Sequence, residues 1–168
     1  MLSWLASLEL TPLSVWIRES PSLWAFPFIL YLHTLGLAML AGLSVGIDFW
    51  LLAVRARPLL ATMAGLYRVM WLGFAVNAVS GLLLLLAYPA KALTNWVFFV
   101  KLLLIAIGVL LLELMRKDSF AAAGAAAQPV SVQTRRLAML SLGCWAGAIL
   151  AGRLLAYTHS ILLASEGF

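Results

Sequence analysis

Four long apolar stretches, separated by short polar segments, dominate the hydrophobic pattern of this chain. They cover about residues 23–52, 69–88, 95–115 and 137–163, and none shows the alternation of a membrane β-strand. Backbone N–H and C=O groups find no water inside a bilayer, so continuous apolar stretches of this length form helices. The pattern predicts an all-α integral membrane protein, with a four-helix transmembrane bundle formed by residues 21–168.

The first twenty residues follow a different pattern. Trp4, Glu9, Trp16 and Arg18 are scattered among leucines. Such a mixture favours a helix that lies in the membrane interface over one that crosses the lipid. We therefore expect residues 1–20 to form an interfacial N-terminal helix.

Composition strengthens the membrane assignment and excludes several function classes. Hydrophobic residues make up 65% of the 168 residues and charged residues only 10%, whereas soluble domains carry about 25% charged residues. The net charge of +5 comes from basic residues spread between the apolar stretches, which indicates topology signals and no nucleic-acid partner. The single cysteine, Cys144, excludes an intrachain disulfide and a cysteine-based metal motif.

The distribution of Lys and Arg predicts the orientation. Seven lie in or beside the first and third connections, and only Arg18 and Lys91 lie on the other side. The positive-inside rule then places these two connections in the cytoplasm and both termini outside. The seven are Arg55, Arg57, Arg68, Arg116, Lys117, Arg135 and Arg136.

In this topology the two histidines and two cations share the outer half of the bundle. His33 and Lys101 each lie about 8 Å below the outer edge, and Arg153 lies about 9 Å deeper than His159. Two acids, Asp48 and Glu113, fall near the cytoplasmic side beside Arg55, Arg57 and Arg116, where a charge network is expected. Intramembrane charges normally face the interior and are paired. The lack of a carboxylate at the depth of Lys101 and Arg153 therefore predicts a bound anion.

Small residues share helix faces with both histidines. Gly36 lies on the face of His33, together with Leu40 and Ser44, and Gly152 lies on the face of His159. Such small residues allow two helices to pack closely. They equally provide room for a flat cofactor between helices. The sequence leaves both interpretations open.

A b-type haem would use this set of residues. His33 and His159 would be its axial, metal-binding ligands, and Lys101 and Arg153 would pair with its two propionates. The alternatives are two hydrogen-bonded histidines without a metal, or Cu(I) bound with Met39. Met39 follows His33 by six residues and points about 120° away from it, which disfavours copper. Asn77 is expected to form an interhelical hydrogen bond or to line the same space.

The sequence shows none of the residue arrangements that are typical of an enzyme active site. The sequence lacks a nucleophile–base pair at suitable spacing, two carboxylates at one depth and a phosphate-binding glycine loop. We therefore expect no catalytic residues, and a redox subunit in preference to an enzyme that acts on its own.

Three segments carry a resemblance: "SPSLWAFPFILYLHTLGLAMLAGLSVGIDFWLL", "NWVFFVKLLLIAIGVLLLE" and "LSLGCWAGAILAGRLLAY". They resemble an uncharacterised bacterial family of small four-helix integral membrane proteins, a domain of unknown function. Its elements match His33-x-x-Gly36, an aromatic entry that ends at Lys101, and a Gly-Arg-x-x-Ala-Tyr ending. That ending matches Gly152, Arg153, Ala156 and Tyr157 here, which adds Tyr157 to the candidate site. His159 lies outside the matched parts.

The layout is also distantly similar to copper-resistance D type and cytochrome b-type membrane proteins. The resemblance implies metal or electron traffic at the periplasmic face of a bacterial inner membrane. The prediction is thus an electron-transfer subunit holding one haem b among membrane lipids, with a redox partner protein or a second copy of the chain. The alternatives are a non-catalytic anchor or assembly subunit, and a protein that binds or transports copper or a small anion.

Overall fold

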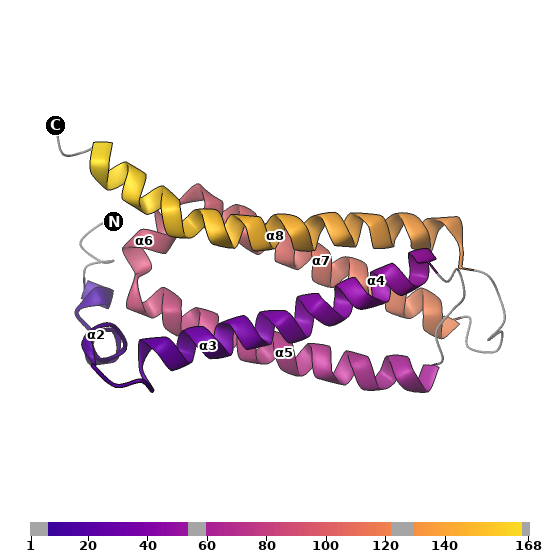
Figure 1. Ribbon diagram of the computed structural model, residues 1–168, viewed down its shortest axis with the longest axis horizontal. Coiled ribbons are helices and arrows are strands. Elements are labelled where there is room, and N and C mark those ends of the chain that lie inside the picture. Colours follow the sequence, from indigo (N-terminus) through magenta and orange to yellow (C-terminus); the bar gives the residue numbers. More distant parts are fainter. Residues whose placement is uncertain (1–6, 54–59, 122–129, 166–168) are drawn as a thin grey trace.

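The computed structural model describes residues 7–53, 60–121 and 130–165, and within these ranges it is helical without β-strands. Four helices are long and apolar enough to cross a membrane: Phe26–Ala53, Ala64–Ala87, Trp96–Asp118 and Val132–Leu155. The chain is therefore a multi-pass membrane protein with an all-α, four-helix bundle, as the sequence predicted. In Figure 1 these helices lie roughly along the long axis of the molecule.

The first spanning helix has three parts: α3 (Phe26–Leu37), the π-helical turn η1 (Ala38–Gly42) and α4 (Leu43–Ala53). The other three spans are formed by α5 (Leu60–Ala87), α7 (Trp96–Ala121) and α8 (Val132–Ser165). The helices extend beyond the apolar stretches because a helix continues past the lipid boundary into polar sequence. Pro27 lies in the first turn of α3, where its missing N–H leaves no hydrogen bond unmade.

Two short helices lie at the end of the bundle where α3 and α7 begin. We call this the α6 end, after α6 (Pro89–Leu93), and the opposite one the α4 end. The second short helix, α2 (Pro12–Glu19), is seen nearly end-on in Figure 1 and so runs across the spanning helices. Its Ile17 is fully buried against the end of α5, and Arg18 donates to the Ala87 carbonyl at 3.3 Å. The helix expected in the N-terminal segment is thus tied to the bundle, while residues 1–6 lie outside the described ranges.

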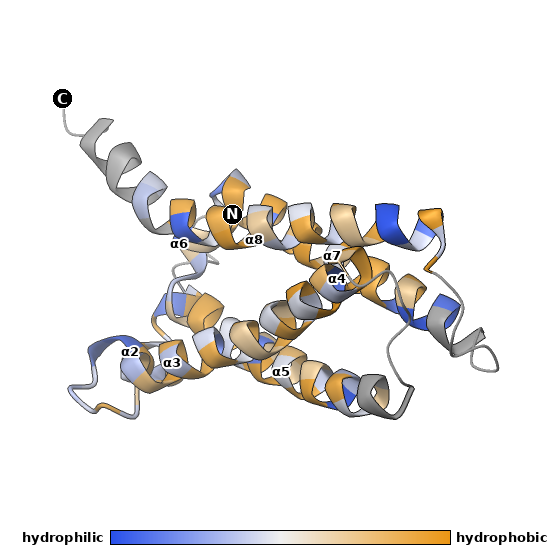
Figure 2. Ribbon diagram, turned by 45° about the vertical axis from the view of Figure 1, so that its right-hand side comes forward, coloured by the Kyte–Doolittle hydropathy of each residue, from blue (hydrophilic) through white to orange (hydrophobic). Residues whose placement is uncertain are grey.

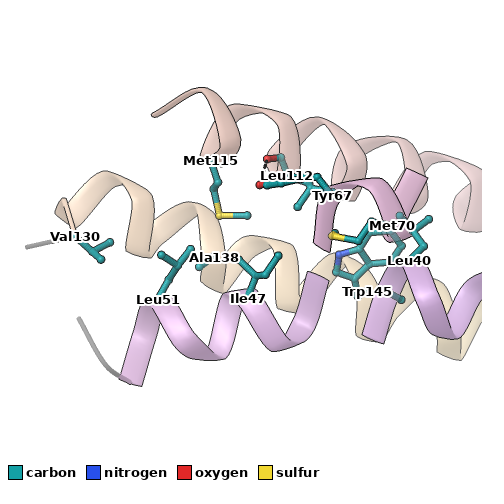
Figure 3. Packing of buried hydrophobic residues seen from close by; sticks show 11 residues of the cluster. Leu40, Ile47, Leu51, Tyr67, Met70, Leu112, Met115, Val130, Ala138 and Trp145 are labelled. Atoms are coloured by element: carbon teal, nitrogen blue, oxygen red, sulfur yellow. Dashed lines mark hydrogen bonds between the residues drawn. The ribbon is translucent and has the colours of Figure 1, made fainter. Parts of the chain in front are cut away.

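Most of the apolar core lies in the half near the α4 end. Figure 3 shows this cluster, in which Leu51, Met70, Leu112 and Met115 from α4, α5 and α7 are almost completely buried. Trp145 of α8 is fully buried, and its Nε1 donates to Ser44 Oγ at 2.9 Å. In the described part of the chain, the buried apolar cluster of the α6 half is smaller and belongs to α2, α3 and α5.

The helices pack as two pairs that meet near the α4 end. Helix α3 packs on α5, and α7 packs on α8, while α4 crosses over to α8. Figures 1 and 2 show α3 apart from α8 at the α6 end and α4 against α8 at the other end. Residues of α3 and α4 therefore face different partners, although they belong to one continuous span.

The π-helical turn η1 explains this change of partner. A π-helical turn has one residue more than an α-helical turn, so it rotates the following helix about its axis. In a regular helix Ser44 would share the face of His33, as the sequence predicted. In the structure His33 contacts α5, while Ser44 bonds Trp145 of α8. The predicted stripe from His33 to Ser44 is therefore wrong, because η1 interrupts the helical periodicity.

Candidate functional site

His33 lies about two turns into α3, half-buried, with its ring held against α5. Its Nδ1 is 3.1 Å from the Asn77 carbonyl oxygen and 3.2 Å from Ser80 Oγ. The Ser80 hydroxyl donates its own hydrogen to the Val76 carbonyl at 2.6 Å. Asn77 Nδ2 also lies 3.4 Å from Nδ1. In the tautomer that carries the hydrogen on Nδ1, Nδ1 donates to the Asn77 carbonyl and Nε2 has the lone pair.

Two further contacts fix the position of the histidine on α5. Asn77 Nδ2 donates to the His33 backbone carbonyl at 2.8 Å. A Cβ atom added to Gly81 would lie 3.0 Å from His33 Cε1, so the glycine leaves room for the ring to approach the helix. Asn77 is therefore the interhelical hydrogen-bond partner that the sequence suggested. Ser80 and Gly81 were missed, although they follow Asn77 at helical spacing on the same face of α5.

Lys101 of α7 approaches the same region from the other helix pair. It is half-buried and lies within electrostatic range of His33. Its Cε and Cδ lie 3.8 and 3.9 Å from the position that a Cβ of Gly152 would take, so the aliphatic chain lies along α8 at that glycine. Within the described ranges no acid pairs with Lys101. We call His33, Lys101 and Gly152 the α6-end site.

The structure does not unite the whole predicted set. Gly36 faces the backbone of α5, and a Cβ there would lie 2.6 Å from Asn77 N and 2.8 Å from Gly73 O. Close helix packing therefore occupies the space beside Gly36, which is one of the two interpretations that the sequence left open. Arg153 and Tyr157 are exposed in the single chain, so the expectation that Arg153 faces the interior is wrong. Because Gly152 faces Lys101, the next residue points about 100° away from it.

His159 is part of α8, but its side chain lies outside the part that the structure describes. Its position along the helix is known. It follows Gly152 by seven residues, which is about two helical turns along α8. The described residues include no cluster of three or more His, Cys, Asp or Glu side chains suited to a metal ion. A haem with two axial histidines does not require such a cluster.

At the α4 end, one half of the expected charge network is present. Arg116 pairs with Glu113, with Nε to Oε2 at 2.8 Å, and its guanidinium carbon lies 5.9 Å from the centre of the Tyr67 ring. Asp48 does not join this pair. It is fully buried and faces the interior of the bundle. Arg55 and Arg57, its predicted partners, lie outside the described ranges.

Comparisons with protein-family models, with curated proteins and with solved structures found no match to this chain. The resemblance drawn from the sequence stays a prediction, and the function has to be argued from the residues and their geometry.

The Asn77–His33 hydrogen bond provides a first test of this geometry. We expect Asn77→Ala to lower the free energy of unfolding by about 1 kcal/mol, the usual size of one interhelical hydrogen bond in a membrane protein. Unfolding of the detergent-solubilised protein in increasing dodecyl sulfate, followed by circular dichroism, measures this change. Val79→Ala is the control, because Val79 is 63% exposed on the same helix. An equal loss in both variants would contradict the assigned bond.

Proposed function

We propose that this protein is a membrane electron-transfer subunit that binds one b-type haem through His33. The observation that carries the proposal is the hydrogen bond from His33 Nδ1 to the Asn77 carbonyl. Histidines that bind metals usually donate their other ring N–H to a carbonyl or carboxylate, which fixes the tautomer and the ring orientation. His33 has this arrangement, with Nε2 as the ligand nitrogen.

Lys101 and Gly152 support the same proposal. The Lys101 ammonium brings a positive charge to the region of His33 without a described acid to neutralise it, and a haem propionate would supply the negative charge. The aliphatic part of Lys101 lies against α8 at Gly152, at ordinary van der Waals distance from an added Cβ. His159, two turns further along α8, is proposed as the second axial ligand. When bound, the haem would accept and release one electron at a potential that its axial ligands set.

The proposed location is the inner membrane of a bacterium, with both termini and the α6-end site on the periplasmic side. The charge asymmetry supports this orientation. Arg116, Lys117, Arg135 and Arg136 lie near the α4 end, and such an excess of basic residues is typical of the cytoplasmic side. In this arrangement the haem would exchange electrons with a periplasmic partner protein or with a second copy of the chain.

The decisive experiment is a dithionite-reduced minus oxidised absorption spectrum of the detergent-purified protein, together with a pyridine haemochrome assay. We expect the sharp bands of a b-type haem at about one haem per chain. A full-length, folded protein that remains colourless after expression with excess haem precursor would exclude the proposal. A partner protein that then co-purifies in a fixed ratio would favour the anchor or assembly function.

Lys101 favours one further candidate, a site for a small anion. His33 and Lys101 together present a hydrogen-bonding ring and a positive charge without an acid from the described residues. For an anion site we expect a colourless protein whose melting temperature rises with added phosphate or chloride and no longer does so in Lys101→Gln. For a haem site we expect Lys101→Gln to keep the spectrum and to shift the redox potential. Lys101→Gln therefore distinguishes the two functions: it abolishes the stabilisation by the anion in one case, and it keeps the haem spectrum with a shifted potential in the other.

A further inference from the structure

Asp48 and Ser141 form a pair of buried polar groups in the α4 half of the bundle. Asp48 follows Ser44 by one turn on α4, and Ser141 precedes Trp145 by one turn on α8. The two helices run in opposite directions, so the Ser44–Trp145 hydrogen bond brings the next pair, Asp48 and Ser141, opposite each other. Both residues are 0% exposed. The Asp48 carboxyl lies within interaction range of Ser141.

In the described part of the chain, neither group has a hydrogen bond of normal geometry. Both carboxyl oxygens of Asp48 and the Oγ of Ser141 are buried without a partner. The flanking residues on α4, Ile47 and Leu51, belong to the apolar core. An ionised carboxylate in such surroundings carries a large desolvation cost, so the group takes up a proton or binds a cation.

Among the described residues, no basic group forms an ion pair with Asp48. Tyr67 of α5 lies within electrostatic range of Asp48, but its hydroxyl donates to the Leu112 carbonyl at 3.4 Å. Arg116 of α7 pairs with Glu113. Arg135 of α8 lies six residues before Ser141 and forms no described ion pair with Asp48. The described oxygens at this position are the two of Asp48 with Ser44 and Ser141, fewer than the six to eight that a hard cation such as Ca²⁺ prefers.

We propose that Asp48 is a proton-binding site, whose carboxyl group carries a proton in the folded protein. The O–H of this protonated carboxyl group donates a hydrogen bond to Ser141 Oγ. Proton binding converts the carboxylate to the neutral acid, and release returns the proton to water at the α4 end. This site lies in the opposite half of the bundle from His33 and does not depend on haem binding. It gives the protein a group that can take up or release one proton from one side of the membrane.

Infrared spectroscopy of the purified protein, at neutral pH in water and in deuterium oxide, tests the proposal directly. We expect the carbonyl stretching band of a protonated carboxyl group, which shifts to lower frequency in deuterium oxide. The band should be lost in Asp48→Asn, where an amide of the same shape replaces the acid. Glu113→Gln is the matched control and should keep the band, because Glu113 is paired with the Arg116 guanidinium and is not the proposed site.

Ser141→Ala keeps the test informative if Asp48→Asn does not fold. Loss of the accepting hydroxyl should move the band to higher frequency without removing it. A wild-type protein that lacks the band at neutral pH, or a band that survives in Asp48→Asn, would overturn the proposal. A band that disappears when sodium replaces choline in the buffer would also overturn it, in favour of a monovalent cation at Asp48.

Discussion

Replacing His33 by alanine is expected to abolish the reduced-minus-oxidised haem spectrum of the purified protein while leaving the chain inserted and helical. The alanine removes Nε2, the nitrogen that would bind the iron of the proposed haem. The structural loss is modest, because the ring is half-buried and one of its partners, Ser80, keeps its bond to Val76. Absorption spectroscopy and circular dichroism of the same sample separate these two effects.

Thr34→Ala is the matched control for this variant. Thr34 is the next residue along α3, is exposed, and donates only to the Leu30 carbonyl of its own helix at 3.0 Å. It should keep a full spectrum. Added imidazole should restore part of the spectrum in His33→Ala, since it can occupy the emptied ligand position. If His33→Ala keeps its haem at wild-type stoichiometry, His33 is not the ligand.

The second large effect is expected at Gly36, where α3 and α5 cross in backbone contact. In Gly36→Ala the new Cβ would lie 2.6 Å from Asn77 N and 2.8 Å from Gly73 O, and neither backbone atom can move without displacing α5. Overpacking of this kind costs about 1–3 kcal/mol. The variant should unfold at lower dodecyl sulfate concentration and at a lower melting temperature. Because His33 lies one turn away, a loss of haem should accompany the loss of stability.

Gly42→Ala makes the same chemical change in the same membrane span and should have the opposite sign. An added Cβ at Gly42 would meet nothing within 4 Å, and the same holds for Gly46 in α4. Without a steric cost, alanine is the better helix former by up to about 1 kcal/mol. Equal destabilisation by Gly36→Ala and Gly42→Ala would show that α3 and α5 do not cross at Gly36. It would also show that this helix needs glycine for its stability at both positions, whatever the neighbouring contacts are.

Much of the fold could be predicted from the order of apolar and polar residues. Continuous apolar stretches must form helices in lipid, which yields four spans without knowledge of any contact. The approximate depth of His33 and Lys101 follows from counting residues along those helices. Asn77 could be recognised as a hydrogen-bonding residue because an amide in the middle of an apolar helix needs a partner.

The faces of the helices could not be predicted in the same way. Their prediction assumed one regular helix from His33 to Ser44, and no residue type in the sequence signals the π-helical turn at Ala38–Gly42. A glycine at position 36 is equally compatible with a cofactor and with the backbone of another helix, so the residue type does not distinguish the two. Only the position of α5 shows that Asn77 and Gly73 fill that space. Arg153 was expected to face the interior of the bundle because it is charged, yet its side chain is exposed on the surface of the single chain.

The sequence by itself therefore determined the membrane class, the number of spans and which residues are candidates for a site. These depend on hydrophobicity and on the need to satisfy the backbone in lipid, and both are local properties of the chain. The tertiary structure decided which of the described residues meet: His33 with Asn77, Lys101 with Gly152, and Asp48 with Ser141. That outcome depends on the crossing of α3 with α5 and on the rotation of α4 by η1, which arise from packing between segments far apart in the sequence.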